Sequence, residues 1–118
     1  MRYIDPNQPG SKVQFKAQYE NFIGGQWVPP VKGEYFGNSS PVDGKVFTQI
    51  PRSSIEDIEL ALDAAHKAKA DWNSSSPTVR SNLLLKIADR LEENLELLAV
   101  AETWENGKPI RETLAADI

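Results

Sequence analysis

The chain has 118 residues, of which 40% are hydrophobic and 25% are charged, and this composition indicates one small soluble domain rather than two. Its net charge of -4 comes from interspersed acids and bases, which argues against a nucleic-acid partner. The absence of cysteine excludes disulfides, thiolate metal sites and a cysteine nucleophile within these residues. The sequence shows neither a secretory signal nor an apolar run of the roughly 18 residues that a membrane span needs. We therefore expect a cytoplasmic protein with no membrane partner.

The first part of the chain predicts an arm and a short hairpin. Residues 1–20 are polar and contain prolines and glycine, which predicts an irregular N-terminal arm. The segment 22–28 then places apolar residues on both sides of Gly24 and Gly25. Because glycine adopts positive φ at little cost, this pattern predicts two short strands joined by a tight turn.

A second hairpin is predicted between residues 35–36 and 46–50. The segment 41–44, Pro-Val-Asp-Gly, has proline and glycine where a turn needs a fixed and a permissive φ. Pro51 is expected to end the second strand, because proline lacks a backbone donor.

From residue 53 the apolar period changes from two to about 3.6, which predicts a helix over 54–72. Ser53 and Glu56 fit a capping box, in which the serine caps the first turn and the glutamate reaches back to it. One apolar stripe of this helix consists of Ile55, Ile58, Leu62, Ala65 and Trp72.

A second helical pattern begins at the serine–proline pair 76–77, which supplies an N-cap and a first-turn proline. The pattern runs to Trp104 with a bend near Asn94, and the segment 106–109, Asn-Gly-Lys-Pro, predicts its end. Another helical start over 110–118 has no cap behind it. The stripe expected to be buried consists of Val79, Leu83, Leu84, Ile87, Ala88 and Leu91.

These helices have wide apolar faces, whereas the predicted strands are few and short. Two hairpins cannot cover so much apolar surface. We therefore expect the 118 residues to belong to a larger protein or to pack against a partner.

Residues that commonly carry chemistry are sparse. His66 is the single histidine and is expected to be a solvated helix residue, because one histidine makes neither a metal cluster nor a catalytic triad. No glycine-rich phosphate loop is present, so we predict no catalytic and no cofactor-binding residue in this chain. The tryptophans Trp27, Trp72 and Trp104 are expected to be core residues.

Glu105 is the exception, because it falls in the last turn of a predicted helix, where the helix dipole disfavours negative charge. A helix cap explains Gly107 and Pro109 but does not explain this glutamate. A carboxylate beside helix-end carbonyls offers only oxygen ligands, which hard cations prefer. A cation site is therefore the alternative to a plain helix cap.

In this order and spacing, the segments resemble the aldehyde dehydrogenase family along nearly the whole chain. The matching stretches are 21–28, 40–44, the alanine-rich helix that ends at Trp72, 80–89 and 102–109. The stretches 40–44 and 111–117 are most similar to bacterial members that oxidise acetaldehyde and other short aliphatic aldehydes.

The resemblance implies an α/β fold in which residues 21–118 form the N-terminal portion of a Rossmann-like cofactor domain, incomplete as a domain, behind the arm 1–20. It implies a longer parent enzyme, a homo-oligomer, that oxidises aldehydes with NAD or NADP. The catalytic cysteine and glutamate would lie beyond Ile118, so this segment would be inactive alone. The alternative is a non-catalytic interaction module derived from the same fold.

The resemblance also bears on the cation hypothesis. Some family members bind a sodium or potassium ion near the positions that correspond here to Glu105 and to the backbone of Asn38 and Ser39. Family members commonly carry aspartate where this chain has Glu105, so the longer side chain is expected to change the coordination.

Overall fold

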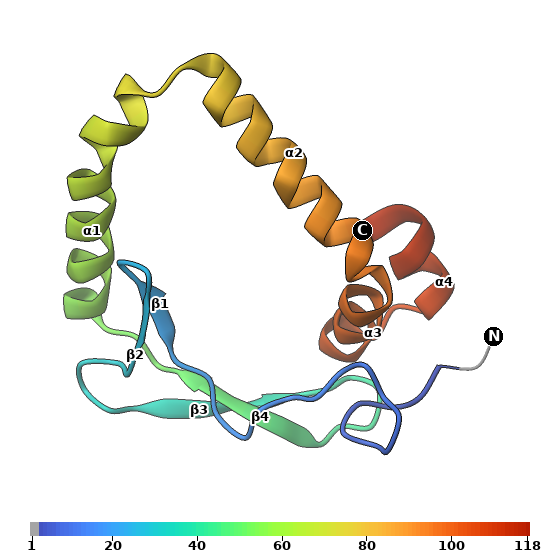
Figure 1. The fold of residues 1–118 in the computed structure, drawn as a ribbon. Helices are drawn as coiled ribbons and strands as arrows, with labels where there is room; N and C mark the ends of the chain where they lie inside the picture. Colours follow the sequence, from blue (N-terminus) through green and yellow to red (C-terminus); the bar gives the residue numbers. More distant parts are fainter. Residues whose placement is uncertain (1–2) are drawn as a thin grey trace.

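The computed structural model describes residues 3–118, which form two antiparallel hairpins followed by helical segments (Figure 1). The strands are β1 (Asn21–Ile23), β2 (Gln26–Val28), β3 (Tyr35–Ser39) and β4 (Val46–Pro51). The helices are α1 (Ile55–Ser74), α2 (Pro77–Glu93), α3 (Leu95–Asn106), α4 (Ile110–Glu112) and a terminal π-helical turn η1 (Thr113–Asp117). In the ribbon, α1, α2 and α3 follow one another as an arch above the β3–β4 hairpin, with α1 at one end of the arch and α3 at the other.

The β1–β2 hairpin forms where the glycine pair predicts it. Phe22 lies opposite Trp27, and Gly24 and Gly25 adopt φ angles of 61° and 82° at the turn. The two aromatic rings pack with their centroids 4.9 Å apart. Trp27 is nevertheless 61% exposed, so the prediction that it is a core residue is wrong for this chain. Trp72 on α1 is likewise exposed.

The β3–β4 hairpin is longer, and its strand register shifts between Asn38 and Ser39. Its predicted turn at 41–44 is confirmed, because the Gly44 amide donates to the Ser40 carbonyl at 2.8 Å and the Ser40 amide to the Lys45 carbonyl at 3.0 Å. The turn brings Ser40 and the end of β3 beneath the end of α3.

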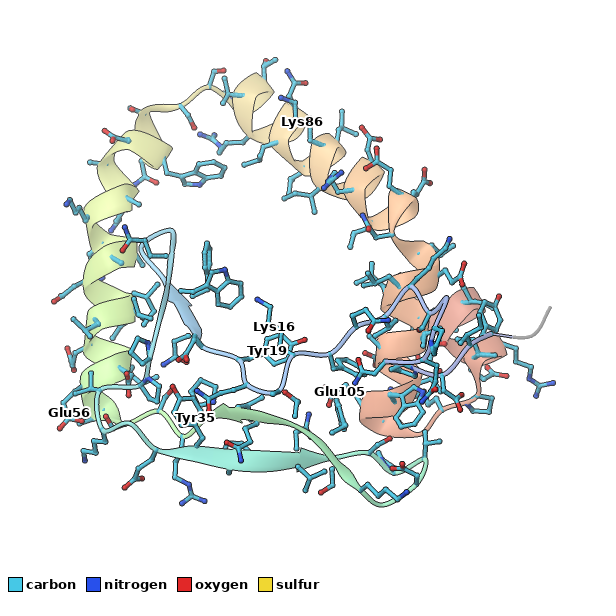
Figure 2. All side chains as sticks on the ribbon, turned by 60° about the horizontal axis from the view of Figure 1, so that its bottom comes forward. Lys16, Tyr19, Tyr35, Glu56, Lys86 and Glu105 are labelled. Atoms are coloured by element: carbon cyan, nitrogen blue, oxygen red, sulfur yellow. The ribbon has the colours of Figure 1, made fainter. Side chains whose placement is uncertain are left out.

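The irregular segment that precedes β1 lies along the outer edge of β4. The Tyr19 amide donates to the Gln49 carbonyl at 2.9 Å, and the Gln49 amide donates to the Ala17 carbonyl at 3.0 Å. The Thr48 hydroxyl adds a hydrogen bond of 2.7 Å to the Lys16 carbonyl. In Figure 2 the side chains of Lys16 and Tyr19 point into the space beneath the arch. Residues 1 and 2 of the predicted arm lie outside the described residues.

The predicted capping box at Ser53 and Glu56 is wrong by one residue. Helix α1 begins at Ile55 and its N-cap is Ser54. The Ser53 hydroxyl is instead engaged with the side chain of Asn21, accepting from Nδ2 at 2.9 Å and donating to Oδ1 at 3.1 Å. The Ser53 hydroxyl is therefore occupied by Asn21, 32 residues away in sequence, and Ser54 is the N-cap of α1.

Asp57 is the residue that fastens the start of α1. Its carboxylate accepts from the Ser54 amide at 2.7 Å and from the Val31 amide, in the β2–β3 connection, at 2.9 Å. The residue is buried, and these backbone hydrogen bonds lower the pKa of the Asp57 carboxyl below its ordinary value. One ionised carboxylate thus joins the helix to the strands.

The second helical pattern is divided into α2 and α3 by Asn94, where a bend is predicted. The Asn94 amide side chain donates to the Arg90 carbonyl at 2.8 Å and so satisfies part of the α2 end. Helix α3 ends at Asn106, as predicted. The expected helix over 110–118 is instead the single turn α4 followed by η1.

The prediction that the apolar stripe of α2 is buried is wrong within this chain, and the apolar stripe of α1 is exposed as well. Exposed apolar side chains include Ile55, Ile58, Leu62, Trp72, Val79, Leu83, Leu84, Ile87 and Leu91. The buried apolar residues that the structure describes are few, namely Val13, Ala99 and Val100. The expectation that two hairpins cannot cover the helix faces is confirmed. Between residues 3 and 118, no helix combines the length and the apolar character that a membrane crossing requires.

Replacing Asp57 with asparagine should lower the melting temperature of the protein at neutral pH. Since the folded-state pKa is lowered, the stabilisation is present above the ordinary carboxyl pKa and is lost as the pH falls through the lowered value. The difference between wild type and Asp57→Asn should therefore shrink below about pH 4. Thermal unfolding, monitored by circular dichroism from pH 3 to 7, measures this difference in melting temperature. Asp63→Asn, at an exposed position of the same helix, is the control and should show no comparable difference.

Candidate functional site

The residues that the sequence singles out meet where the C-terminal end of α3 rests on the β3–β4 hairpin. We call this region the α3–hairpin joint and define it by Asn38, Ser40, Pro41, Glu105 and Gly107. The last carbonyls of a helix have no partner within the helix, so they need donors from elsewhere. The hairpin supplies one of them.

Ser40 makes the central contact of the joint. Its hydroxyl donates to the Trp104 carbonyl at 2.6 Å, although the two residues are 64 positions apart. The same oxygen accepts from the Val42 amide at 3.2 Å. Ser40 is only 1% exposed, so this hydrogen bond is shielded from water and fixes the helix end against the turn.

Gly107 makes the close approach possible. It adopts φ 78° as the left-handed cap of α3, and its amide donates to the Thr103 carbonyl at 2.8 Å. A Cβ at this position would lie 3.0 Å from the Cβ of Pro41. Both the backbone conformation and the contact therefore require glycine.

Glu105 and Asn38 form the polar edge of the joint. The Nδ2 of Asn38 lies 3.0 Å from Oε1 and 2.8 Å from Oε2 of Glu105, so one amide group faces both carboxylate oxygens. Glu105 is exposed, Asn38 is half-buried, and Ser39 is exposed at the register shift. Figure 2 shows the Glu105 side chain at the α3 end of the arch.

The structure thus brings together two of the three predicted ligand residues through a contact that the prediction did not contain. The sequence interpretation assigned Asn38 a backbone role, whereas the structure shows its side-chain amide on the carboxylate. The predicted turn at 41–44 does not include Ser40, and the sequence does not predict its contact with the Trp104 carbonyl. No local pattern reports such contacts, because they join segments more than 60 residues apart.

The joint contains one charged side chain among its defining residues. Glu105 supplies one negative charge, and the group that faces its carboxylate is the Nδ2 of Asn38. Over residues 3–118 no group of three or more histidine, cysteine, aspartate or glutamate side chains could hold a metal ion. Such clusters are what zinc and other transition metals need.

The segment after Gly107 is fastened back onto α3 and so supports the joint. Thr113 is fully buried, and its hydroxyl lies 3.2 Å from the Ala99 carbonyl and 3.2 Å from the Thr103 hydroxyl. Lys108 forms an ion pair of 2.8 Å with Asp117, and this hydrogen-bonded partner raises the pKa of Lys108.

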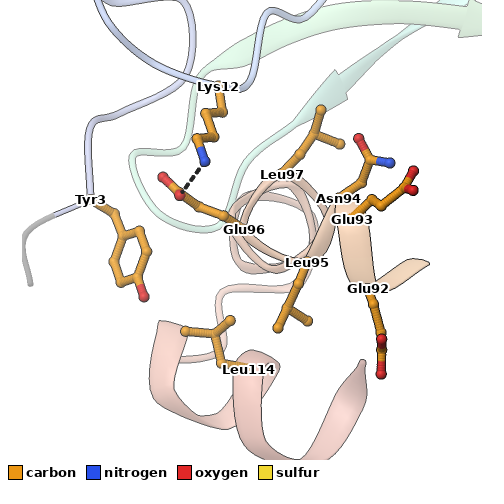
Figure 3. Close-up of a pocket in the computed structure, with 9 residues that line it drawn as sticks. All are labelled: Tyr3, Lys12, Glu92, Glu93, Asn94, Leu95, Glu96, Leu97 and Leu114. Carbon is orange, nitrogen blue, oxygen red and sulfur yellow. Dashed lines mark ion pairs between the residues drawn. The ribbon is translucent and has the colours of Figure 1, made fainter. Parts of the chain in front are cut away.

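A second candidate is the recess of about 530 Å³ at the α2–α3 junction (Figure 3). Its lining residues are Tyr3, Lys12, Glu92, Glu93, Asn94, Leu95, Glu96, Leu97 and Leu114. Lys12 is held in an ion pair of 2.9 Å with Glu96, and Glu93 pairs with Arg90 at 2.8 Å. The lining contains neither a thiol nor an imidazole, and its one lysine is held in the ion pair with Glu96. His66 is exposed on α1, away from this lining.

Comparison with known proteins gives concordant results. The chain matches the model of a family described as "Aldehyde dehydrogenase family" over residues 27–118. A long-chain-aldehyde dehydrogenase of Acinetobacter sp is 81% identical over 118 residues, which are 100% of this chain and 24% of that protein. An acetaldehyde dehydrogenase of Pseudomonas aeruginosa is 61% identical over 118 residues, again 100% of this chain and 23% of that protein.

Solved structures show the same likeness. PnpE in complex with nicotinamide adenine dinucleotide is 38% identical with a TM-score of 0.83, over 86% of this chain and 21% of that one. A variant of aldehyde dehydrogenase C from Pseudomonas syringae, complexed with NAD+ and octanal, is 27% identical with a TM-score of 0.83 over the same shares. The chain spans about a quarter of the length of the curated relatives cited above.

Replacing Gly107 with alanine should destabilise the protein by about 2–4 kcal/mol, because alanine is strained at positive φ and its Cβ would press on Pro41. Gly44→Ala is the matched control: it has φ 72° and nothing within 4 Å of the added Cβ. This control should cost only about 1–2 kcal/mol. Urea unfolding of the protein measures both, and equal losses would show that the contact with Pro41 contributes nothing.

Proposed function

We infer that this chain, which belongs to the aldehyde dehydrogenase family, is the N-terminal part of an enzyme that oxidises aldehydes to carboxylic acids with NAD or NADP. The observation that carries this proposal is the family match over residues 27–118. The chain's own contribution is structural: it supplies the arch, the hairpins and the joint between them.

The reaction converts an aldehyde, water and the oxidised nicotinamide into a carboxylic acid, the reduced nicotinamide and a proton. Enzymes of this class attack the carbonyl with a thiolate and pass a hydride to the cofactor. This chain contains no cysteine, so the nucleophile is proposed to lie in the remainder of a longer polypeptide. Residues 1–118 alone are then inactive.

The exposed helix faces support the proposal of a longer polypeptide. Side chains such as Leu83, Leu84 and Ile87 on α2 are 43–67% exposed, and faces of this width are covered in stable proteins. We propose that the rest of the same polypeptide covers them and that the complete enzyme is a homo-oligomer. A non-catalytic module of the same fold would instead present these faces to a separate partner.

The substrate is proposed to be an aliphatic aldehyde, and the sequence resemblance points to acetaldehyde and other short ones. The printed names of the relatives differ in chain length, because the protein at 81% identity is a long-chain-aldehyde dehydrogenase and that at 61% is an acetaldehyde dehydrogenase. Relative activity along an aldehyde series distinguishes these classes.

The full-length gene product should reduce NAD or NADP when it is mixed with aliphatic aldehydes from two to twelve carbons. The increase in absorbance of the reduced nicotinamide measures the rate for each aldehyde and each cofactor. The separately expressed residues 1–118 serve as the control and should give no rate. A full-length product without activity on any of these aldehydes would favour the non-catalytic module.

We also propose that Glu105, with backbone oxygens of Asn38 and Ser39, holds a sodium or potassium ion in the complete enzyme. A cation here offsets the negative charge that Glu105 adds to the C-terminal end of α3. The ion would have a structural role, since it would join β3 to α3 and take no part in hydride transfer.

Sodium or potassium chloride should raise the melting temperature of the full-length protein relative to choline chloride at the same ionic strength. Ligand binding to the folded state alone stabilises it in proportion to the logarithm of ion concentration above the dissociation constant. Replacing Glu105 with alanine should abolish this rise, as measured by scanning fluorimetry. A Glu105→Ala protein that responds to the ions as wild type does contradicts the site.

A further inference from the structure

We propose that the apolar groove between α2 and α3 is filled by the stretch of the longer polypeptide that directly follows Ile118, folded as an amphipathic helix antiparallel to α2. This inference rests on the proposed function, in which these 118 residues are the front of a longer enzyme. It deepens that proposal, because it assigns one exposed face to one segment and gives the segment a conformation and a direction.

The groove is a recess of about 470 Å³ along the C-terminal part of α2 and the start of α3. Leu83, Ile87 and Leu91 follow one another at intervals of four residues and so form one row on α2. These three side chains are between 43% and 48% exposed. Leu97 and Leu98 of α3 also line the groove. Continuous apolar recesses of this kind are covered in stable proteins.

The end of the described chain lies beside this groove. Leu114 of η1 lines the recess at the α2–α3 junction that Figure 3 shows, and Asn94 and Leu97 line both that recess and the apolar groove. The buried Thr113 fastens η1 to α3. Figure 1 likewise marks the C-terminus next to the end of α2. The polypeptide that continues after Ile118 therefore starts at the α3 end of the groove.

Proximity favours this segment over other occupants. A tethered segment has an effective concentration in the millimolar range at a site that its linker can reach, which a separate molecule in solution does not have. The relative at 81% identity is matched over only 24% of its own length, so a protein of that length has ample further polypeptide. Short connections make successive helices antiparallel neighbours, which sets the direction.

A helix fits the groove, whereas a strand does not. The surfaces of α2 and α3 offer rows of side chains and no backbone edge, so the backbone groups of a strand buried there would lack partners. A helix satisfies its own backbone groups and packs its side chains between the rows. The groove follows α2 from Leu83 to Asn94, roughly 17 Å at a rise of about 1.5 Å per residue, so a helix of about 12 residues fills it.

The rim of the groove specifies the polar side of the incoming helix. Lys86 and Arg90 line the groove one turn apart on α2. Arg90 pairs with Glu93 at 2.8 Å, whereas Lys86 takes part in no ion pair within residues 3–118. The incoming helix is therefore expected to carry aliphatic residues at three- and four-residue spacing and an acidic residue on the side that faces Lys86.

Site-specific photo-crosslinking in the full-length protein tests this assignment. Ile87→p-benzoylphenylalanine places a group in the groove that links to neighbouring C–H bonds on irradiation, and mass spectrometry identifies the linked peptides. Lys86→p-benzoylphenylalanine, on the rim, is the second variant if the bulk at Ile87 prevents folding. Both should link to peptides within about 25 residues after Ile118, a length that allows for a short connection and the helix.

Leu85 provides the matched control. It is also apolar and is 61% exposed, but it does not line the groove, because two residues turn the helix by about 200° between Leu85 and Ile87. The photoreactive residue in place of Leu85 should give no link to the segment that position 87 reaches.

Each outcome decides the inference. Links confined to the segment directly after Ile118 support it. Links to a second copy of the protein, seen as a covalent dimer, or to a distant part of the same polypeptide overturn it, and so does the absence of links from both groove positions. The dehydrogenase assay of the full-length protein decides the proposed reaction separately, whereas a gene product that ends at Ile118 overturns both.

Discussion

The arrangement of this chain depends on hydrogen bonds between the ends of helices and the segments that connect the strands. At one end of the arch the Ser40 hydroxyl donates a hydrogen bond to the Trp104 carbonyl. At the other end the Asp57 carboxylate accepts a hydrogen bond from the Val31 amide. Helix ends leave backbone groups without partners, and burying such groups unpaired is costly. The first contact joins α3 to the β3–β4 turn, the second joins α1 to the β2–β3 connection, and α2 spans the distance between the two helices.

Burial of apolar side chains normally dominates the stability of a folded protein. Here the apolar faces of α1 and α2 remain exposed, and the core that the described residues form is small. At about 25 cal/mol per Å² of buried apolar surface, the stabilisation that these faces can provide is realised only when something covers them. The polar contacts at the feet of the arch orient the faces, and the proposed remainder of the enzyme would supply the burial.

The sequence was informative wherever structure follows from neighbours in the chain. The glycine pair at 24–25, the turn at 41–44 and the stop at Gly107 all lie where turn and cap chemistry predicts them. It failed where a distant residue intervened. Ser53 has the type and spacing of an N-cap, but Asn21 occupies its hydroxyl and the cap moves to Ser54. Apolar periodicity likewise identified the faces of the helices, yet it cannot say whether the covering surface belongs to these 118 residues.

The candidate site shows the same limit more sharply. That Glu105 is misplaced for a helix end can be read from the sequence, since the dipole argument needs only its position relative to Gly107. The group that hydrogen-bonds to Glu105 cannot be read from the sequence, because Asn38 is 67 residues away and reaches Glu105 only through the fold of the hairpin. The joint therefore contains two kinds of contact. Ser40 and Gly107 fix the approach of helix and hairpin through buried or close-packed atoms, and such contacts admit no substitute. Glu105 faces solvent at the edge of the same joint, where the Asn38 amide donates to both of its oxygens.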